Sequence, residues 1–348
     1  MDAGRGGFEY VADPAFGVRE YHGASGVATR TPADPLGLVT GVHVGGMAFL
    51  PDGRLVAAVI ETGRLAILDA DGLAWSLLAE AGPATRDLAI APDGTILALV
   101  DGQGLVRFDP ADGENLGVLV PVGPDLRDPR AVDIDPQGRL LVVDATSGAW
   151  IGDPATGRLT ASLAVPAELQ PRAVAGLPGG DLLVSGVVDP KRFPDTPVVW
   201  RLPLDGSPAT AWARNYPIEE PWDITYDPDG GSVHVPTRRG SGWRIVEVRA
   251  DDEFYMRAFV RGDEEMTRPT AVAFRPASPL DLNRDLVPDA CQCRPDLDAS
   301  GAVDIGDLLR VLADWDAVVN PGSGSDIDGD GLVGFADLSA VLAAWGPC

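Results

Sequence analysis

The sequence predicts a mainly β protein with a small α-helical domain at its C-terminus. Three observations support this fold class. A turn of the Pro-Asp-Gly type recurs at nearly regular intervals along positions 1–280, strand-like runs flank each turn, and the C-terminal segment from Asp296 onward contains two copies of an acidic loop with a short helix. With 348 residues, 45% of them hydrophobic, the chain can form one large β domain and a small second domain.

The repeated turn separates the first two strands of each repeat. Its copies are Pro51-Asp52-Gly53, Pro92-Asp93-Gly94, Pro136-Gln137-Gly138, Pro178-Gly179-Gly180 and Pro228-Asp229-Gly230, with a degenerate sixth copy at Pro276. The strands before these turns are predicted at Met47–Leu50, Leu88–Ala91, Ala131–Asp135, Ala173–Leu177, Ile224–Asp227 and Ala271–Arg275. Three more strands follow the turn in each of the first five repeats, beginning with runs such as Leu55–Ile60 and Ile96–Val100. Apolar runs between Gly, Pro and Asp turns are typical of antiparallel strands.

Four-stranded repeats of about 40 residues are typical of β-propeller blades. The sixth repeat stops after one strand, Ala271–Arg275. The N-terminus supplies what is missing, because Phe8–Asp13 and Gly17–Gly23 match the second and third strands of a blade. We therefore expect a six-bladed β-propeller over residues 8–280, closed by N- and C-terminal strands so that no open sheet edge remains.

The repeats resemble those of NHL and related six-bladed propellers, as in Pro129-Arg130-Ala131-Val132-Asp133-Ile134-Asp135-Pro136. The resemblance covers residues 8–280 and implies a fold rather than one activity. Related six-bladed enzymes include sugar lactonases, which hold a channel metal through Glu, Asn and Asp, and streptogramin lyases, which rely on His.

One ring of equivalent positions lies six residues before each turn proline. Its members are Gly45, Arg86, Arg130, Arg172, Trp222 and Thr270. In a propeller, the innermost strand begins here, beside the central channel. Guanidinium groups bind carboxylates or sulfates through paired hydrogen bonds, and Trp stacks on sugar faces. The three arginines and the tryptophan therefore form a candidate rim for an anionic or carbohydrate ligand.

The rim has a purely structural alternative. Its arginines could pair with the nearby Asp87, Asp133 and Asp223 and serve only to hold the blades in place. The sequence leaves both interpretations open.

Catalytic motifs are few in the propeller region. The histidines His22, His43 and His234 are scattered, and Asn115 and Asn215 are predicted on outer strands, away from the channel. We find no Gly-x-Ser-x-Gly elbow, no His-Glu-x-x-His helix and no phosphate loop. The sequence assigns no catalytic residue and favours a non-enzymatic function. A hydrolase or lyase acting on polysaccharide or sugar lactone is the alternative.

The charge of the chain excludes some partners and points to a metal. The net charge of −25 argues against nucleic acid and anionic membranes. No run approaches the roughly 18 apolar residues of a membrane span. Residues 281–348 hold 13 Asp, no Glu and three Arg, which indicates a supply of metal ligands.

The two acidic loops, which begin at Asp296 and Asp326, have the spacing of calcium-binding loops. Each loop has oxygen-bearing residues and Gly at fixed positions. In the first loop they are Asp296, Asp298, Ser300, Gly301, Asp304 and Asp307, and in the second they are Asp326, Asp328, Asp330, Gly331, Gly334 and Asp337. Calcium takes about six to eight oxygen ligands, and Gly at position 6 permits the sharp turn. Each loop runs into a short amphipathic helix. The sequence therefore predicts two calcium ions.

A calcium loop plus a following helix, in tandem, resembles a type I dockerin, an EF-hand-like module, over residues 294–347. The resemblance implies as ligands Asp296, Asp298, Ser300, Ala302 (carbonyl), Asp304 and Asp307, and Asp326, Asp328, Asp330, Leu332 (carbonyl) and Asp337. It also implies that Val303 and Val333 pack in a small core. Because the carboxylates of each loop repel one another at close range without calcium, we expect chelation to unfold residues 294–347 and to spare the propeller. The partner that the resemblance implies is a cohesin-like or other cell-surface protein.

A third acidic cluster lies just before the tandem loops. It contains Asp281, Asn283, Asp285 and Asp289 and resembles the calcium repeats of thrombospondin type 3 linkers. Leu286 replaces the usual Gly, which strains the turn. The segment is either a third calcium site or a plain acidic linker.

The three cysteines, Cys291, Cys293 and Cys348, flank the tandem loops, and no cysteine precedes them. This distribution suits a secreted protein with one disulfide, although all three could instead be reduced. The N-terminus has no apolar signal-peptide core, so the expected extracellular or cell-surface location rests on the calcium loops and cysteines. The dockerin resemblance brings the module's ends together and implies a Cys293–Cys348 bridge in preference to Cys291–Cys348.

The predicted organisation is a propeller over residues 1–280, an acidic linker over 281–293 and a calcium module over 294–348. The predicted function is that of a secreted calcium-binding protein. Its propeller would present a binding surface, and its dockerin-like module would attach it or assemble it with a partner.

Overall fold

The computed structural model describes most of the propeller region and parts of the C-terminal region. The described residues are 8–22, 27–70, 72–188, 191, 198–212, 218–227, 231–239, 242–250, 256–261, 266–275, 295, 297, 302–303, 305–317, 325–327, 332–343 and 345–347. The chain divides into two units, of which Phe8–Arg275 is one and the described residues from 295 onward belong to the other. Each unit is described by itself below.

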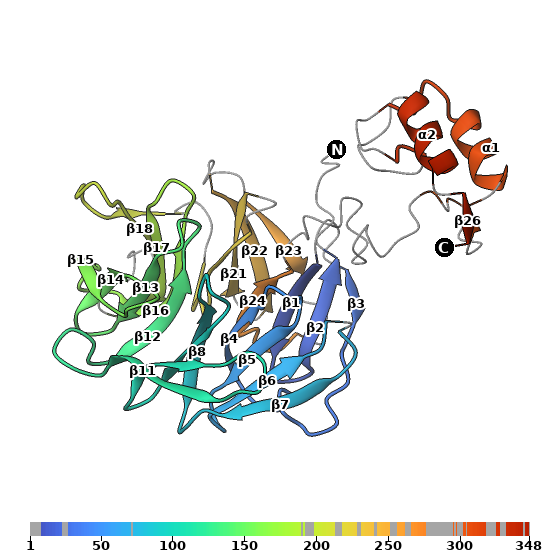
Figure 1. Cartoon of the computed structure of the whole chain (residues 1–348). Coiled ribbons are helices and arrows are strands. Elements are labelled where there is room, and N and C mark those ends of the chain that lie inside the picture. The colour runs from blue at the N-terminus through green and yellow to red at the C-terminus, as the bar shows by residue number, and fades with distance from the viewer. Residues whose placement is uncertain are drawn as a thin grey trace. The chain divides into compact units, whose positions relative to one another are not determined.

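The first unit is a six-bladed β-propeller built from six four-stranded antiparallel sheets (Figure 1). Blade 1 contains β4 (Val44–Phe49), β5 (Leu55–Val59), β6 (Arg64–Leu68) and β7 (Trp75–Glu80). Blade 2 contains β8 (Thr85–Ile90), β9 (Ile96–Val100), β10 (Gly104–Phe108) and β11 (Asn115–Pro121). Blade 3 contains β12 (Pro129–Ile134), β13 (Leu140–Asp144), β14 (Gly148–Gly152) and β15 (Leu159–Leu163).

The remaining blades complete the ring. Blade 4 contains β16 (Gln170–Gly176), β17 (Leu182–Val187), β18 (Val199–Leu202) and β19 (Thr210–Ala211). Blade 5 contains β20 (Thr225–Asp227), β21 (Ser232–Arg239), β22 (Gly242–Arg249) and β23 (Met256–Arg261). Blade 6 contains β24 (Ala271–Phe274), β1 (Phe8–Asp13), β2 (Gly17–His22) and β3 (Ala28–Arg30).

Blade 6 is the closure that the sequence predicts. Its strand order is β24-β1-β2-β3, so the N-terminal strands follow the last C-terminal strand as second, third and fourth members. The antiparallel register places Glu9 opposite Phe274 and Ala12 opposite Ala271. The prediction that both ends of the propeller region share one blade is confirmed.

The core lies between neighbouring blades. Every residue of β5, β9 and β13 is buried, because both faces of these strands are covered by adjacent sheets. This is why their sequences read as continuous apolar runs instead of alternating with polar residues. The outer strands β11 and β15 are mostly exposed or half-buried. Asn115 begins β11, the outermost strand of blade 2, as expected, whereas Asn215 lies outside the described residues.

The second unit contains two short helices, α1 (Ile305–Ala313) and α2 (Phe335–Ala343), and a two-stranded sheet of β25 (Ala302–Val303) and β26 (Gly346–Pro347). Its apolar cluster is formed by Val303, Val311, Ile327, Val333 and Val341. The expected packing of Val303 and Val333 in one small core is therefore found. In the described parts of the chain, neither α1 nor α2 has the length and hydropathy of a membrane span.

Candidate functional site at the channel mouth

In blades 1 to 4, the predicted rim positions share one backbone feature, a β-bulge at the start of the innermost strand. In blades 1 to 4 the pairing register shifts across Gly45, Arg86, Arg130 and Arg172. A bulge leaves its extra residue unpaired and re-aims that side chain. The same irregularity at equivalent positions turns successive side chains toward one end of the propeller.

Two rim arginines are already satisfied by carboxylates. The guanidinium of Arg86 forms a bidentate ion pair with Asp101, one bond of which measures 2.9 Å. Arg130 is paired with Asp128. The sequence had offered Asp87 and Asp133 as their partners. The ion pairs instead join Arg86 to the end of the neighbouring strand and Arg130 to a residue two positions away.

The indole ring of Trp222 is contacted by one predicted rim residue, Arg172, and by two further residues, Arg268 and His43. The guanidinium carbon of Arg172 lies 4.4 Å from the ring centroid, and that of Arg268 lies 4.1 Å from it. The imidazole of His43 is stacked at 6.3 Å and 20°. His43 enters blade 1 and Trp222 enters blade 5, and these blades are not neighbours in the ring. Trp222 therefore reaches across the mouth of the channel.

Backbone contacts fix the segments that carry Trp222 and Arg268. The buried carboxylate of Asp13 accepts the backbone N–H groups of Thr267 (2.8 Å) and Arg268 (2.6 Å). The backbone N–H of Trp222 donates to the carbonyl of Pro236 at 3.3 Å. Glu220, two residues before Trp222, has a φ of 48°, a left-handed conformation that costs energy for a non-glycine residue. Such strain is concentrated at ligand-binding segments.

The site holds two arginines beyond those that pair with carboxylates, although the protein is acidic and the imidazole of His43 contacts the carboxylate of Glu61. Burial, with Arg268 and Arg130 nearby, lowers the pKa of Arg172 from its usual value, against an opposing effect of Glu220. Glu220 contacts Arg238 at 3.6 Å. Among the described residues, neither Arg172 nor Arg268 forms an ion pair. The arrangement can therefore accept an anion.

Sequence reasoning did not place Arg268 and His43 at this site. Both lie eight residues before a turn proline, His43 before Pro51 and Arg268 before Pro276. Repeating the alignment two positions earlier would have found them. Because the sixth turn is degenerate, the equivalence of Arg268 to His43 is hard to recognise in the sequence.

Below the rim, three aspartates connect neighbouring blades. Each innermost strand has one edge without a partner strand, and its N–H groups need acceptors. Carboxylates of the preceding blade supply them: Asp87 accepts from Val132 (2.8 Å), Asp133 from Gly176 (3.0 Å) and Asp223 from Val272 (2.9 Å). The second oxygen of each accepts the N–H of the residue that follows it.

These aspartates have raised pKa values. Burial is the largest cause and raises the pKa of Asp133 to about 7 and that of Asp223 to about 6. The pKa of Asp87 lies well above its usual value for the same reason, with a contribution from the charge of Asp223. All three keep some accessible surface, yet protein surrounds them closely enough for desolvation to dominate. In the described part of the chain, no three His, Cys, Asp or Glu side chains converge as they would around a metal ion.

Five of the predicted calcium ligands lie within the described residues. They are Ala302, Asp307, Asp326, Leu332 and Asp337. Asp296, Asp298, Ser300, Asp304, Asp328 and Asp330 lie outside them, as do Asp281, Asn283, Asp285, Asp289, Cys293 and Cys348.

The two loop-terminal aspartates have equivalent surroundings. Asp307 accepts the N–H of Leu297 at 2.6 Å, and Asp337 accepts that of Ile327 at 2.6 Å. Asp337 also accepts the N–H of Gly334 at 2.7 Å and so caps the start of α2. The side chains of Asp307 and Asp337 are fully buried, and Asp326 is 1% exposed.

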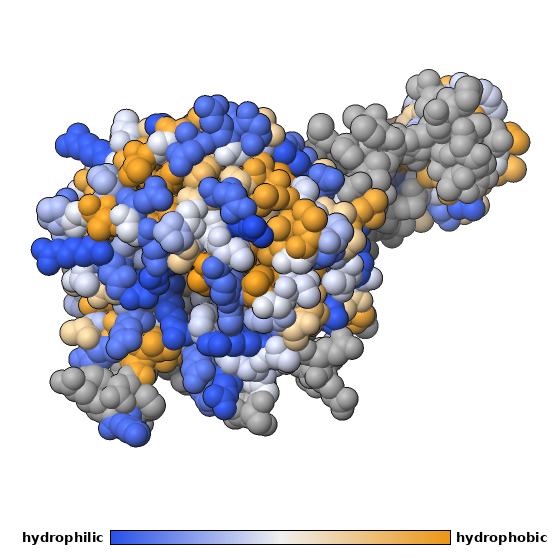
Figure 2. All heavy atoms as spheres, turned by 90° about the horizontal axis from the view of Figure 1, so that it is seen from below, coloured by the Kyte–Doolittle hydropathy of each residue, from blue (hydrophilic) through white to orange (hydrophobic). Residues whose placement is uncertain are grey.

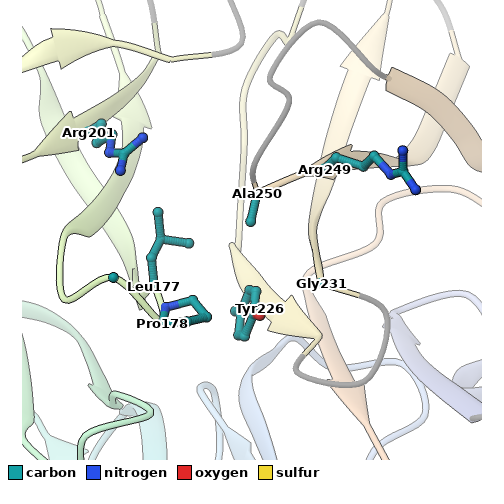
Figure 3. A pocket seen from close by; sticks show the side chains of 8 residues that line it. Leu177, Pro178, Arg201, Tyr226, Gly231, Arg249 and Ala250 are labelled. Atoms are coloured by element: carbon teal, nitrogen blue, oxygen red, sulfur yellow. The ribbon is translucent and has the colours of Figure 1, made fainter.

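A separate cavity lies between blades 4 and 5, at the opposite end of β16 from Arg172. It has a volume of about 360 Å³, and Leu177, Pro178 and Tyr226 line it together with Arg201 and Arg249 (Figure 3). Arg201 is paired with Asp181 at 2.7 Å. Figure 2 shows hydrophilic and apolar residues interspersed over one face of the protein.

No protein-family model matches the chain, and no curated protein matches it either. Solved structures resemble its propeller. A chain of the nidogen–laminin complex is 12% identical with a TM-score of 0.61, covering 78% of this chain and 99% of that one. TolB from Acinetobacter baumannii is 15% identical with a TM-score of 0.57, covering 78% and 67%. Virginiamycin B lyase from Staphylococcus aureus is 13% identical with a TM-score of 0.51, covering 74% and 85%. At these identities the likeness establishes the β-propeller fold alone.

Proposed function

We propose that this chain is a secreted, calcium-stabilised binding protein. Its propeller holds an anionic ligand at the channel mouth, and its C-terminal module attaches it to a partner. The observation that carries the binding role is the pair of arginines, Arg172 and Arg268, set against Trp222 with no acidic partner among the described residues. A propeller is a suitable scaffold for partners, as the nidogen–laminin complex illustrates for another protein of this fold.

The calcium role is supported by three buried carboxylates in the second unit. Asp307, Asp326 and Asp337 are almost completely inaccessible to water. Burying carboxylates is costly unless cations or hydrogen bonds compensate for the lost hydration. Carboxylate oxygens are the ligands that calcium prefers. A hard divalent cation coordinated by these carboxylates at each loop would offset the cost.

The attachment role is supported by exposed apolar side chains that recur at equivalent positions of the two loop-and-helix units. The pairs are Ile305 and Phe335, Leu312 and Leu342, and Trp315 and Trp345, all exposed. Exposed apolar clusters on a small domain are typical of interaction surfaces. We propose a cohesin-like or other cell-surface protein as the partner of this surface.

Calorimetric calcium titration of the full chain tests the proposal. We expect two sites, and we expect the double variant Asp307→Asn and Asp337→Asn to lose both, because it removes a charged ligand from each loop. Asp314→Asn is the matched control, since Asp314 is an exposed residue of the same module whose side chain accepts a hydrogen bond from Ser325 at 2.6 Å. Absence of calcium binding, with both helices still protected from hydrogen exchange in excess chelator, would refute the calcium role.

A hydrolase or lyase acting on polysaccharide or sugar lactone is the second candidate function. The observation that favours it is the pKa of about 7 at Asp133, which suits a general base. Against it, both oxygens of Asp133 accept backbone hydrogen bonds. Release of product from a polysaccharide or lactone panel would decide for the enzyme.

A further inference from the structure

We infer that Arg172, Arg268 and Trp222 form a clamp for a tetrahedral dianion, a sulfate or phosphate ester carried by the ligand. This inference rests on the proposed anion-binding role of the channel mouth and specifies its chemistry.

The two guanidinium groups lie over the same indole ring. Both are measured to the same indole centroid, at 4.4 Å and 4.1 Å, so their central carbons are less than about 9 Å apart. They come from different blades, Arg172 from β16 and Arg268 from the segment before β24. Because both guanidinium groups lie over the same ring, a tetrahedral group at the edge of the indole can accept from each of them through different oxygens.

The two arginines favour a ligand that carries two negative charges. Two cations at short range repel each other, and each is partly removed from water. Glu220, the acidic residue that acts on Arg172, already contacts Arg238. A carboxylate carries one charge and matches one guanidinium fork, whereas a dianionic ester neutralises both arginines.

Trp222 provides an independent indication of a ligand. Its indole N–H is buried and has no hydrogen-bond partner among the described residues. A buried donor left unsatisfied costs about 1–3 kcal/mol. An ester oxygen would satisfy it once ligand binding shifts the side chains that cover this N–H. Because the guanidinium groups lie over the indole ring, an anion is favoured over a sugar stacked on Trp222.

The test measures binding of small probes to the full chain by calorimetry. The probes are inorganic sulfate, inorganic phosphate, a sulfated disaccharide, its unsulfated parent, a sugar phosphate and glucuronate. We expect the sulfated or phosphorylated probes to bind, and their affinity to fall at least about tenfold in Arg172→Gln and in Arg268→Gln. The sulfated disaccharide and the sugar phosphate distinguish the two sources of the dianion.

Arg54→Gln is the charge-matched control. Arg54 lies at the opposite end of β4 from the rim and is paired with Asp52 at 2.7 Å, so its loss should leave the affinity unchanged within about twofold. Arg172→Lys keeps the charge without the planar fork and should retain part of the affinity. Thermal unfolding of each variant checks that the propeller is intact.

The outcomes separate two failures. If glucuronate binds through these arginines as tightly as the dianions, the clamp is wrong and the anion-binding role stands. If no anion binds, or if both glutamine variants bind as the native protein does, the clamp is overturned; absence of all anion binding also removes the proposed role of the propeller.

Discussion

At the residue scale, the channel aspartates show how one side chain can join two blades. Each carboxylate accepts one N–H from the residue that follows it and one from the next blade, so that edge groups without a partner strand are satisfied. The same burial that makes these bonds specific makes the charged form costly. Stability near neutral pH should therefore depend on the protonation of these groups.

We predict that the free energy of unfolding falls as the pH rises from about 5 to about 8. The folded pKa of Asp133, about 7, lies above its ordinary 3.8, so the folded protein binds this proton more tightly than the unfolded chain. The resulting stabilisation is fully present below the unfolded pKa and is lost as the pH rises through 7. Neighbouring Asp135 and Asp223 act in the same direction on Asp133. Denaturant unfolding at several pH values measures the slope.

The slope should be smaller in Asp133→Asn, which cannot ionise. Asp153→Asn is the control, because Asp153 is exposed and its pKa is lowered by the N–H of Ala155 and the hydroxyl of Thr156, so it titrates below this range. Parallel curves for the native protein and Asp133→Asn would contradict the assignment.

At the scale of the element, the innermost strand with its bulge is the unit that builds the rim. The sequence predicted where these strands end, because the Pro-Asp-Gly turns mark that point. It predicted their starts poorly: β8 begins at Thr85, three residues before the predicted Leu88. Arg86 and Asp87 do not fit the apolar pattern of a strand. Arg86 lies at the bulge and Asp87 supplies a channel carboxylate, and hydrophobic periodicity predicts neither feature.

The candidate site was predictable to the same extent. Aligning repeats found Arg86, Arg130, Arg172 and Trp222, which share a repeat position. It could not find which arginines are paired, because the partners Asp101 and Asp128 occupy positions that are not shared between these repeats. Ion pairing of this kind depends on side-chain contacts within each blade and not on repeat position.

Gly45 interrupts the ring of arginines for a steric reason. A Cβ at this position would overlap the backbone carbonyl oxygen of Arg86, so blade 1 approaches blade 2 too closely for any side chain. We predict that Gly45→Ala destabilises the propeller by about 1–3 kcal/mol, as overpacking does. Denaturant unfolding measures the change. Gly179→Ala, at a position where nothing lies within 4 Å, should change stability little; an equal loss in both variants would contradict the steric explanation.

At the scale of the whole molecule, the ring depends on a single joint between the two ends of the propeller region. Only β1 connects β24 to β2 in blade 6. We predict that a chain beginning at Ala15, which lacks β1, loses cooperative unfolding and aggregates, because β24 and β2 then expose unpaired edges. A chain beginning at Phe8 is the control, since it keeps all of β1. Sedimentation velocity and thermal unfolding follow both chains, and a monomeric, cooperatively unfolding chain without β1 would refute the prediction.

The pairing of β1 with β24 also means that the two strands of this joint are synthesised far apart in time. Glu9 leaves the ribosome long before its partner Phe274, with five complete blades synthesised between them. At the usual pace of translation, roughly ten to fifty seconds separate the two. During that interval β1 has a free edge beside the growing chain, so a chaperone that shields this strand would protect the propeller until its last strand arrives.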